Sequence, residues 1–171
     1  KEVILKLYER IQVLEGFLVL DETFLDFTEQ EYWASPIKES LDRMLVVRAL
    51  TKYYGMPGVR LGYGFLTNPL LKNTLEKLLD PWHINTFAEI AGKEAHKDLG
   101  YRRRTSIWLQ EEKTHLEKAL EKISFLEWMP SAANFMLLKS LGPTAEEIQE
   151  KLLKKGMLIR LPYGFQGLNP Q

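Results

Sequence analysis

The residues best suited to chemistry lie in the stretch ALTKYYGMPGVRLGY, from Ala49 to Tyr63. Thr51 and Lys52 stand side by side, and Arg60 follows eight residues after the lysine. A guanidinium is a planar, permanently charged donor suited to phosphate, and a threonine offers the same anion a hydroxyl and a backbone N–H. The pattern predicts an anion-binding site beside a lysine whose amine, near a cation and partly removed from water, acts as a nucleophile.

The lysine follows an apolar run, Met44–Leu50, that is typical of a buried strand. The carboxyl end of a strand in a parallel sheet leads into the crevice where ligands bind, so we expect Lys52 to lie there. Small and rigid residues in the intervening loop, Gly55, Pro57 and Gly58, allow it to curl so that Arg60 returns towards Lys52.

A carboxylate ends a second apolar run, FLVLD, from Phe17 to Asp21. Such a run suits a strand buried on both faces, as in a parallel sheet, which would place Asp21 at the same crevice. A carboxylate there can pair with a cationic ring nitrogen. Together with an anion-binding site and a nucleophilic lysine, it favours pyridoxal 5'-phosphate as a cofactor.

Each of these residues also has a simpler interpretation. A lysine after a strand is most often a solvated surface residue. An aspartate at a strand end is often a turn former or a helix cap, and Arg60 could be an ordinary ion-pair partner. Spacing alone leaves these alternatives open.

The elements that must position these residues alternate between helix and short apolar strand, which predicts an α/β fold. Periodicity and capping residues predict helices over 3–14, from Ser35, over 68–79, after Asn85, over 101–123, and from Thr144 to Gly156. Apolar runs predict strands over 17–21, 44–50 and 60–66, one or two strands within 125–140, and a last strand over 157–161. We expect the apolar stripe of the first helix, Val3, Ile4, Leu7, Ile11 and Leu14, to face the core. The expected domains are residues 1–100 and 101–171.

Composition excludes several classes of function. The chain has 171 residues, with 23 Lys and Arg against 23 Asp and Glu, so no net field favours nucleic acid or an anionic membrane. Cysteine is absent, which excludes disulfides and thiolate metal sites, and the three histidines lack metal-ligand spacing, so no metal site is predicted. No apolar run approaches the roughly 20 residues of a membrane span, and we expect a cytoplasmic protein.

The segment LTKYYGMPGVRLGY resembles the active-site lysine segment of fold-type-I, pyridoxal-phosphate-dependent aminotransferases of class I/II. The family pattern, Ser/Gly-x-Ser/Thr-Lys followed by a glycine-containing loop and Arg-x-Gly, is matched by Thr51, Lys52, Gly58, Arg60 and Gly62, and it is not matched at Ala49. VLDETFLDF resembles the family's strand that ends in an aspartate. Within the family, RALTKYYGMPGVRLGY, DPWHINTFAEIAG, PSAANFMLLK and GMLIRLPYGFQGLNP are similar to the threonine-phosphate decarboxylases of cobalamin synthesis, relatives of the histidinol-phosphate aminotransferases.

The resemblance implies roles for individual residues. Lys52 would bond to the cofactor and carry protons, Thr51 and Arg60 would hold its phosphate, and Asp21 its ring nitrogen. Arg160 would bind acidic groups of the substrate. A serine at position 49 would donate to the cofactor phosphate, so Ala49 removes one hydrogen bond. Phe24 stands where histidinol-phosphate aminotransferases usually have a tyrosine, which favours the decarboxylase.

The resemblance further implies part of the large cofactor domain, about three strands with helices, plus a small C-terminal α/β domain. We expect the chain to be a C-terminal fragment, not competent for turnover alone, of a homodimeric enzyme acting on an amino acid or amino-acid phosphate. Decarboxylation of a phosphorylated amino acid is the first hypothesis. Alternatives are a histidinol-phosphate-type or aromatic aminotransferase, and a non-catalytic module that kept the scaffold.

Overall fold

The computed structural model describes residues 1–28, 35–39 and 41–168, and it divides into two compact units, Lys1–Ser106 and Ile107–Gln171. The fold class is α/β, as predicted. The helices and strands are α1 (Glu2–Val13), β1 (Leu18–Asp21), β2 (Met44–Ala49), β3 (Gly62–Leu66), α3 (Pro69–Leu78), α4 (Thr86–Lys97), α5 (Leu99–Leu120), β4 (Leu126–Trp128), β5 (Leu138–Ser140) and α6 (Ala145–Leu153), with short 3-10 turns at Leu25–Phe27, Ile37–Glu39 and Pro57–Val59.

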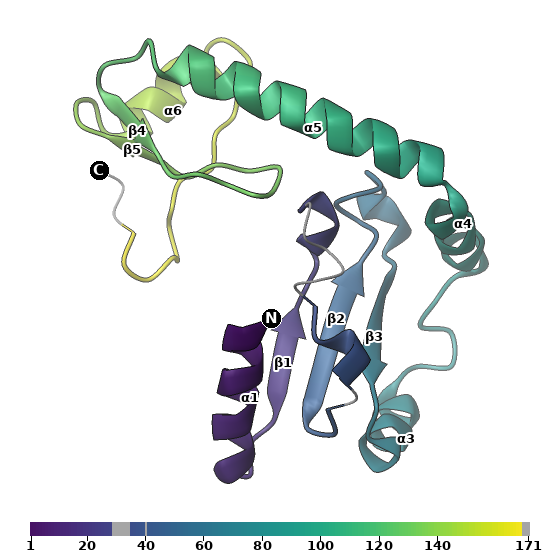
Figure 1. Ribbon diagram of the computed structural model, residues 1–171. Coiled ribbons are helices and arrows are strands. Elements are labelled where there is room, and N and C mark those ends of the chain that lie inside the picture. The colour runs from purple at the N-terminus through teal and green to yellow at the C-terminus, as the bar shows by residue number, and fades with distance from the viewer. Residues whose placement is uncertain (29–34, 40, 169–171) are drawn as a thin grey trace. The chain divides into compact units, whose positions relative to one another are not determined.

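The first unit contains a sheet in the order β1-β2-β3 (Figure 1). β1 runs parallel to β2, with Leu18 opposite Met44 and Asp21 opposite Val47. β3 runs antiparallel to β2, with Ala49 opposite Gly62. The carboxyl ends of β1 and β2 and the start of β3 therefore lie at one edge of the sheet.

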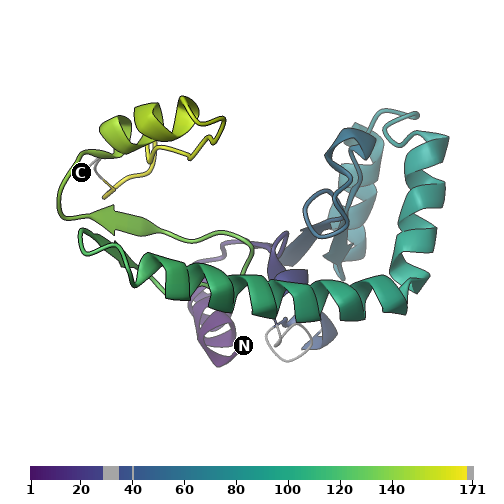
Figure 2. The ribbon, with the colours of Figure 1, turned by 90° about the horizontal axis from the view of Figure 1, so that it is seen from above.

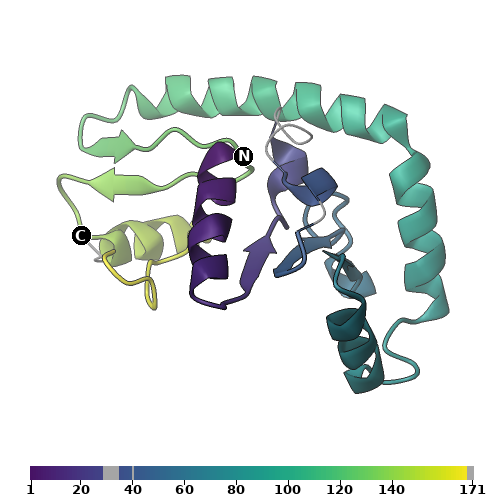
Figure 3. The ribbon, with the colours of Figure 1, turned by 60° about the horizontal axis from the view of Figure 1, so that its bottom comes forward.

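The core of this unit lies between the sheet and α1, which runs beside β1 (Figures 1 and 3). Tyr8 of α1 packs with Met44 and Val46 of β2, and Leu18 and Leu20 of β1 pack against them. The predicted stripe of α1 was wrong in part: Val3, Leu7 and Leu14 are exposed, Ile4 and Ile11 are half-buried, and Tyr8 is buried. The Tyr8 hydroxyl accepts hydrogen bonds from Gln12 and from the backbone N–H of Arg43, so a residue with a polar tip can occupy the core.

Only one face of β1 is covered within the described residues. Leu18 and Leu20 contact the core, whereas Val19 on the other face is 59% exposed. The prediction of a strand buried on both faces was therefore wrong for this chain, because α1 covers a single side of the strand. Asp21 lies on the same side as Val19, since side chains alternate along a strand.

Most helix boundaries follow their local signals. Asn68 and Asn85 cap α3 and α4 by accepting hydrogen bonds from the backbone N–H groups of Leu71 and Ala88. Thr144 and Glu147 form the predicted capping box of α6. The segment after Ser35 forms only the turn Ile37–Glu39, and Ser40 lies outside the described residues.

The second unit contains the antiparallel pair β4-β5 with α6 beside it (Figure 3). α5 begins in the first unit and continues into the second as one uninterrupted helix (Figure 2). The strand predicted over 157–161 does not form: a strand needs a hydrogen-bonded neighbour, and within the described residues this segment pairs with no strand. No helix in the described part of the chain is long and apolar enough to cross a bilayer.

Shortening Val46 to alanine should destabilise the core. Val46 is 1% exposed, so its two lost methyl groups leave a cavity, and we expect the free energy of unfolding to fall by about 2 kcal/mol. Val13 is 84% exposed at the end of α1, and the matched variant Val13→Ala should change it by less than about 0.5 kcal/mol. Urea denaturation followed by circular dichroism measures both, and equal losses would contradict this description of the core.

Candidate active site

The sheet register brings four of the predicted site residues to one edge. Asp21 ends β1, and Thr51 and Lys52 follow β2, whose carboxyl end lies at the same edge because the two strands are parallel. The pairing of β2 with β3 continues one step past Ala49, where the backbone N–H of Leu50 donates to the carbonyl of Leu61 over 3.2 Å. Arg60 therefore lies across from the start of the Lys52 turn.

Lys52 occupies a tight turn held down at both sides. The backbone N–H of Tyr54 donates to the carbonyl of Leu50, and that of Gly55 donates to the carbonyl of Lys52, both over 3.2 Å. Leu50 and Tyr53 are 2% and 4% exposed and anchor the turn in the interior, while the Lys52 side chain is exposed. The expectation that this amine is partly removed from water was thus wrong for the chain alone, because no described element covers it.

Aromatic side chains next to the lysine hold the turn in place. The Tyr53 ring meets Phe27 edge to face with centroids 5.1 Å apart, and Tyr54 stacks on Tyr101 at 5.4 Å. The Tyr101 hydroxyl donates to the carbonyl of Tyr53, and the Tyr53 hydroxyl donates to the carbonyl of Arg102. These contacts join the Lys52 turn to the first turns of α5, so the backbone that carries the lysine has little freedom.

Arg60 has an unusual backbone. It adopts the left-handed conformation with φ 57°, which costs a residue other than glycine of order 1 kcal/mol. Its guanidinium is exposed and donates to the carbonyl of Pro57 over 3.2 Å. Strain of this kind is concentrated at ligand-binding sites, which supports a function for this loop.

Glycines in this loop differ from the prediction in their roles. Gly55 has φ +62° and makes the left-handed turn, whereas Gly58 has an ordinary φ and open space around it. At Gly62 a Cβ atom would lie 3.0 Å from the carbonyl oxygen of Arg48, so glycine permits the close approach of β3 to β2. The curvature of the loop therefore comes from Gly55 and from Pro57, which begins the 3-10 turn.

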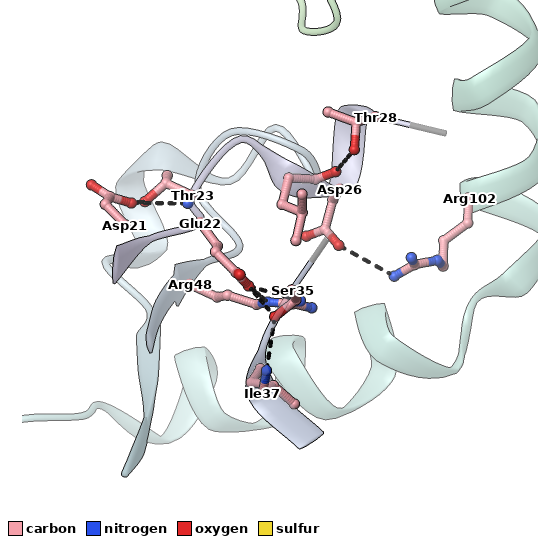
Figure 4. A network of polar contacts seen from close by, with 10 residues as sticks. Asp21, Glu22, Thr23, Asp26, Thr28, Ser35, Ile37, Arg48 and Arg102 are labelled. Atoms are coloured by element: carbon pink, nitrogen blue, oxygen red, sulfur yellow. Dashed lines mark hydrogen bonds and ion pairs between the residues drawn. The ribbon is translucent and has the colours of Figure 1, made fainter. Parts of the chain in front are cut away.

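Asp21 is exposed, and its carboxylate is oriented by Thr23. The backbone N–H of Thr23 donates to Oδ1 over 2.9 Å, and the Thr23 hydroxyl donates to the same oxygen. In Figure 4 the Asp21 side chain points away from Glu22 and Arg48, on the other side of the strand. One carboxylate oxygen is thus fixed by the protein, and Oδ2 accepts no hydrogen bond from the residues that the structure describes.

The sequence interpretation missed a buried polar cluster at the same edge, made of Glu22, Ser35 and Arg48. Glu22 Oε2 accepts hydrogen bonds from Arg48 Nε at 3.0 Å and Ser35 Oγ at 2.9 Å, and Arg48 Nη2 lies 3.0 Å from it (Figure 4). Burial lowers the pKa of Arg48, but the hydrogen bond and charge of Glu22 outweigh it and raise that pKa above its ordinary value. An arginine inside the apolar run Met44–Leu50 was the signal for this pair, since a charge in a buried strand needs a partner.

A second ion pair connects the segment after Asp21 to α5. Asp26 Oδ1 lies 3.7 Å from the guanidinium of Arg102, which also donates to the Tyr54 hydroxyl and lies over the Tyr53 ring. Burial raises the pKa of the Tyr63 phenol, and the charge of Asp26 adds to this, while Arg48 lowers it. The segment after Asp21 and the Lys52 turn are therefore held by the same group of polar and aromatic side chains.

Arg160 belongs to the second unit. It is exposed, its guanidinium lies 5.3 Å from the centre of the Phe165 ring, and it lines an open depression with Leu158, Leu161 and Tyr163. An exposed guanidinium beside an apolar surface suits an acidic ligand with an apolar part.

The chain is similar to known proteins over almost its whole length. The sequence model named "Aminotransferase class I and II" matches residues 1–169. A protein of Caldanaerobacter subterraneus that carries the provisional name of a threonine-phosphate decarboxylase is 38% identical over 95% of this chain and 45% of its own length. Threonine-phosphate decarboxylase of Salmonella typhimurium is 32% identical over 94% of this chain and 44% of its own length. The chain thus spans less than half of these relatives.

A solved structure is similar throughout the described fold. The histidinol-phosphate aminotransferase from Clostridium acetobutylicum aligns with a TM-score of 0.93 and 29% identity, over 99% of this chain and 52% of that one. L-threonine-O-3-phosphate decarboxylase from Porphyromonas gingivalis aligns with a TM-score of 0.83 and 26% identity, over 98% of this chain and 51% of that one.

Proposed function

This chain belongs to the aminotransferase class I and II family, and on that premise we propose that it forms the lysine-bearing part of an enzyme that uses pyridoxal 5'-phosphate. The reaction we propose is decarboxylation of a phosphorylated amino acid, as in the threonine-phosphate decarboxylases that it resembles. The observation that carries the proposal is the register that gathers Lys52, Asp21 and Arg60 at one edge of the sheet.

The residues at this edge fit the cofactor. Its aldehyde requires an amine that ligands can reach, and Lys52 is exposed on a rigid turn. Its phosphate requires donors, which Thr51 and the exposed guanidinium of Arg60 supply. Its ring nitrogen requires an acid, and Asp21 offers a carboxylate with one oxygen fixed by Thr23.

Each residue then has a defined task. Bound at this edge, the cofactor would supply an electron sink for charge that develops at the substrate Cα. Lys52 Nζ would bond to the cofactor and would hold or move a proton at the substrate Cα. Asp21 holds a proton at the ring nitrogen by its negative charge, and Thr51 and Arg60 orient the group through its phosphate.

The wider organisation is part of the same proposal. Residues 1–100 form the later half of the cofactor domain, and residues 101–171 form the connecting helix with part of a small domain, in which Arg160 binds the acidic group of the substrate. The enzyme is a cytoplasmic homodimer in cobalamin synthesis, and it acts on a small molecule. The similarity to threonine-phosphate decarboxylases supports the substrate class.

A second candidate is amino transfer of the histidinol-phosphate type. The solved histidinol-phosphate aminotransferase aligns with the higher TM-score of the two structures above, 0.93 against 0.83. Phe24 favours the decarboxylase, because a tyrosine hydroxyl is absent from the position where these aminotransferases usually have one. The two reactions share the lysine, the arginine and the aspartate, so these residues cannot decide between them.

Assays of the protein expressed from the whole reading frame that contains this chain separate the two. With pyridoxal 5'-phosphate present, we expect carbon dioxide release from threonine phosphate, measured with labelled carboxyl carbon, to exceed amino transfer from glutamate to imidazole or aromatic keto acids. Histidinol phosphate as amino donor is the matched control. Amino transfer without carbon dioxide release would overturn the decarboxylase and support the second candidate. The absence of both reactions would favour a non-catalytic scaffold.

A further inference from the structure

The cluster of Glu22, Arg48 and Ser35 occupies positions that would otherwise continue the apolar core. Leu18 lies opposite Met44 and Leu20 opposite Val46, and these pairs face α1. The next residues on that face are Glu22 and Arg48, and the backbone N–H of Glu22 still donates to the carbonyl of Val47 over 2.8 Å. Two charges thus stand where a third apolar pair would complete the face.

Stability alone does not explain this ion pair, because burying its two charges costs solvation free energy. The Glu22 and Arg48 side chains are 6% and 12% exposed. Removing two charges from water costs several kcal/mol for each ion, and well-packed apolar residues often stabilise a fold equally well. Unlike an apolar pair, this ion pair fixes a direction of contact. Nε and Nη2 of the guanidinium both lie 3.0 Å from Glu22 Oε2.

The contact joins the two strands that carry the candidate cofactor residues. Glu22 directly follows Asp21, and Arg48 lies in β2 four residues before Lys52. Arg48 also lies opposite Tyr63 of β3, and its charge lowers the pKa of that phenol, so its guanidinium lies between the edge of β1 and the strand that follows Arg60. A change in this contact would shift Asp21 relative to Lys52.

Ser35 fixes the carboxylate from the other side. Its hydroxyl donates to Glu22 Oε2, and the same Oγ accepts from the backbone N–H of Ile37 over 3.3 Å. Pro36, the next residue, is fully buried, so the serine backbone is held firmly. Glu22 therefore has partners on two separate segments, and Figure 4 shows its side chain directed away from the Asp21 side of the strand.

We propose that Glu22 and Arg48, with Ser35, form a clamp that sets the position of Asp21 against Lys52, and that they act as positioning residues for the cofactor. The clamp rests on the proposed function, because it acts through residues assigned to pyridoxal 5'-phosphate. Its three side chains are largely buried, and Glu22 contacts the other two. A displacement of about 1 Å at the reacting groups costs up to roughly 10²-fold in rate, so the clamp has a measurable effect.

The test uses the protein from the whole reading frame, loaded with pyridoxal 5'-phosphate, and the variants Glu22→Gln, Arg48→Met and their combination. We expect kcat to fall roughly 10- to 100-fold, with KM little changed. We also expect a shift in the pH at which the visible absorption band of the bound cofactor changes. The double variant should lose no more than the worse single variant, since both changes release one contact. Glu89→Gln, which breaks an exposed ion pair with Lys93, should leave kcat and the band unchanged.

Thermal unfolding of the same samples separates positioning from stability. If kcat per loaded site and the cofactor band stay native while only the melting temperature falls, the clamp is merely structural and the proposal is overturned. Ser35→Ala, which removes one donor, gives a milder test should the charge variants not fold, and we expect a smaller change in the same readouts. A native protein with no cofactor band would overturn the proposed function itself, and would be seen before any variant is made.

Discussion

Replacing Lys52 with alanine is expected to abolish the covalent attachment of pyridoxal 5'-phosphate and to lower kcat by at least roughly 10³-fold. Two losses would combine in this variant, since in the proposed function Nζ both bonds to the cofactor and moves a proton at the substrate Cα. Positioned proton transfer alone contributes about 10²- to 10⁴-fold. The fold should be preserved, because Leu50 and Tyr53 anchor the turn and the Lys52 side chain is exposed.

Borohydride reduction followed by peptide mass spectrometry measures the attachment directly. In the protein from the whole reading frame, the cofactor mass should appear on the peptide that contains Lys52. Lys72→Ala, at an exposed lysine of α3, should retain both the label and the rate. A label that persists in the Lys52 variant, or that lies on another lysine of the native protein, would contradict the assignment.

Local signals explain which parts of the fold could be predicted. Asn68, Asn85 and the Thr144–Glu147 box each bond within one helical turn, so the sequence nearby contains all the information needed. The apolar run Met44–Leu50 likewise predicted β2. The segment 157–161 has the composition of a strand but no strand partner in the described residues, and strand formation depends on a neighbour that composition does not specify.

Partners distant in sequence explain what was missed. Glu22 and Arg48 are 26 residues apart, and they meet only because β1 and β2 pair in a particular register. Tyr8 entered the core because its hydroxyl bonds to the backbone of Arg43, 35 residues away. The contact between Glu22 and Arg48 could be expected once the strands were aligned, since Leu18, Leu20 and Glu22 share one face by alternation.

In the candidate site, too, some features could be predicted from the sequence and others could not. Its edge was predictable, because parallel strands deliver their carboxyl ends together and the loop to Arg60 is short. The exposure of Lys52 was not, since the removal of an amine from water depends on all elements that cover it. The strained backbone of Arg60 was also missed, because a left-handed arginine is set by the packing of the loop and not by residue type.

Replacing Asp21 with asparagine tests the other half of the proposed chemistry. Asparagine keeps the size of the side chain and an Oδ1 that accepts from the Thr23 N–H, so the end of β1 should be unchanged. It lacks the negative charge that, in the proposed function, holds a proton at the ring nitrogen. We expect kcat to fall roughly 10²- to 10³-fold, a loss comparable to that of one preorganised electrostatic contact at a reacting group.

Comparison with Asp21→Glu and Asp42→Asn makes this result specific. Asp21→Glu restores the charge at a changed distance and should recover part of the lost rate, whereas Asp42→Asn removes an exposed charge away from the sheet edge and should have no effect. Steady-state rates with a cofactor titration separate lost binding from lost turnover. If Asp21→Asn keeps the native kcat at saturating cofactor, the carboxylate is a turn former bonded to Thr23, and the charge at this edge of the sheet does not support the reaction.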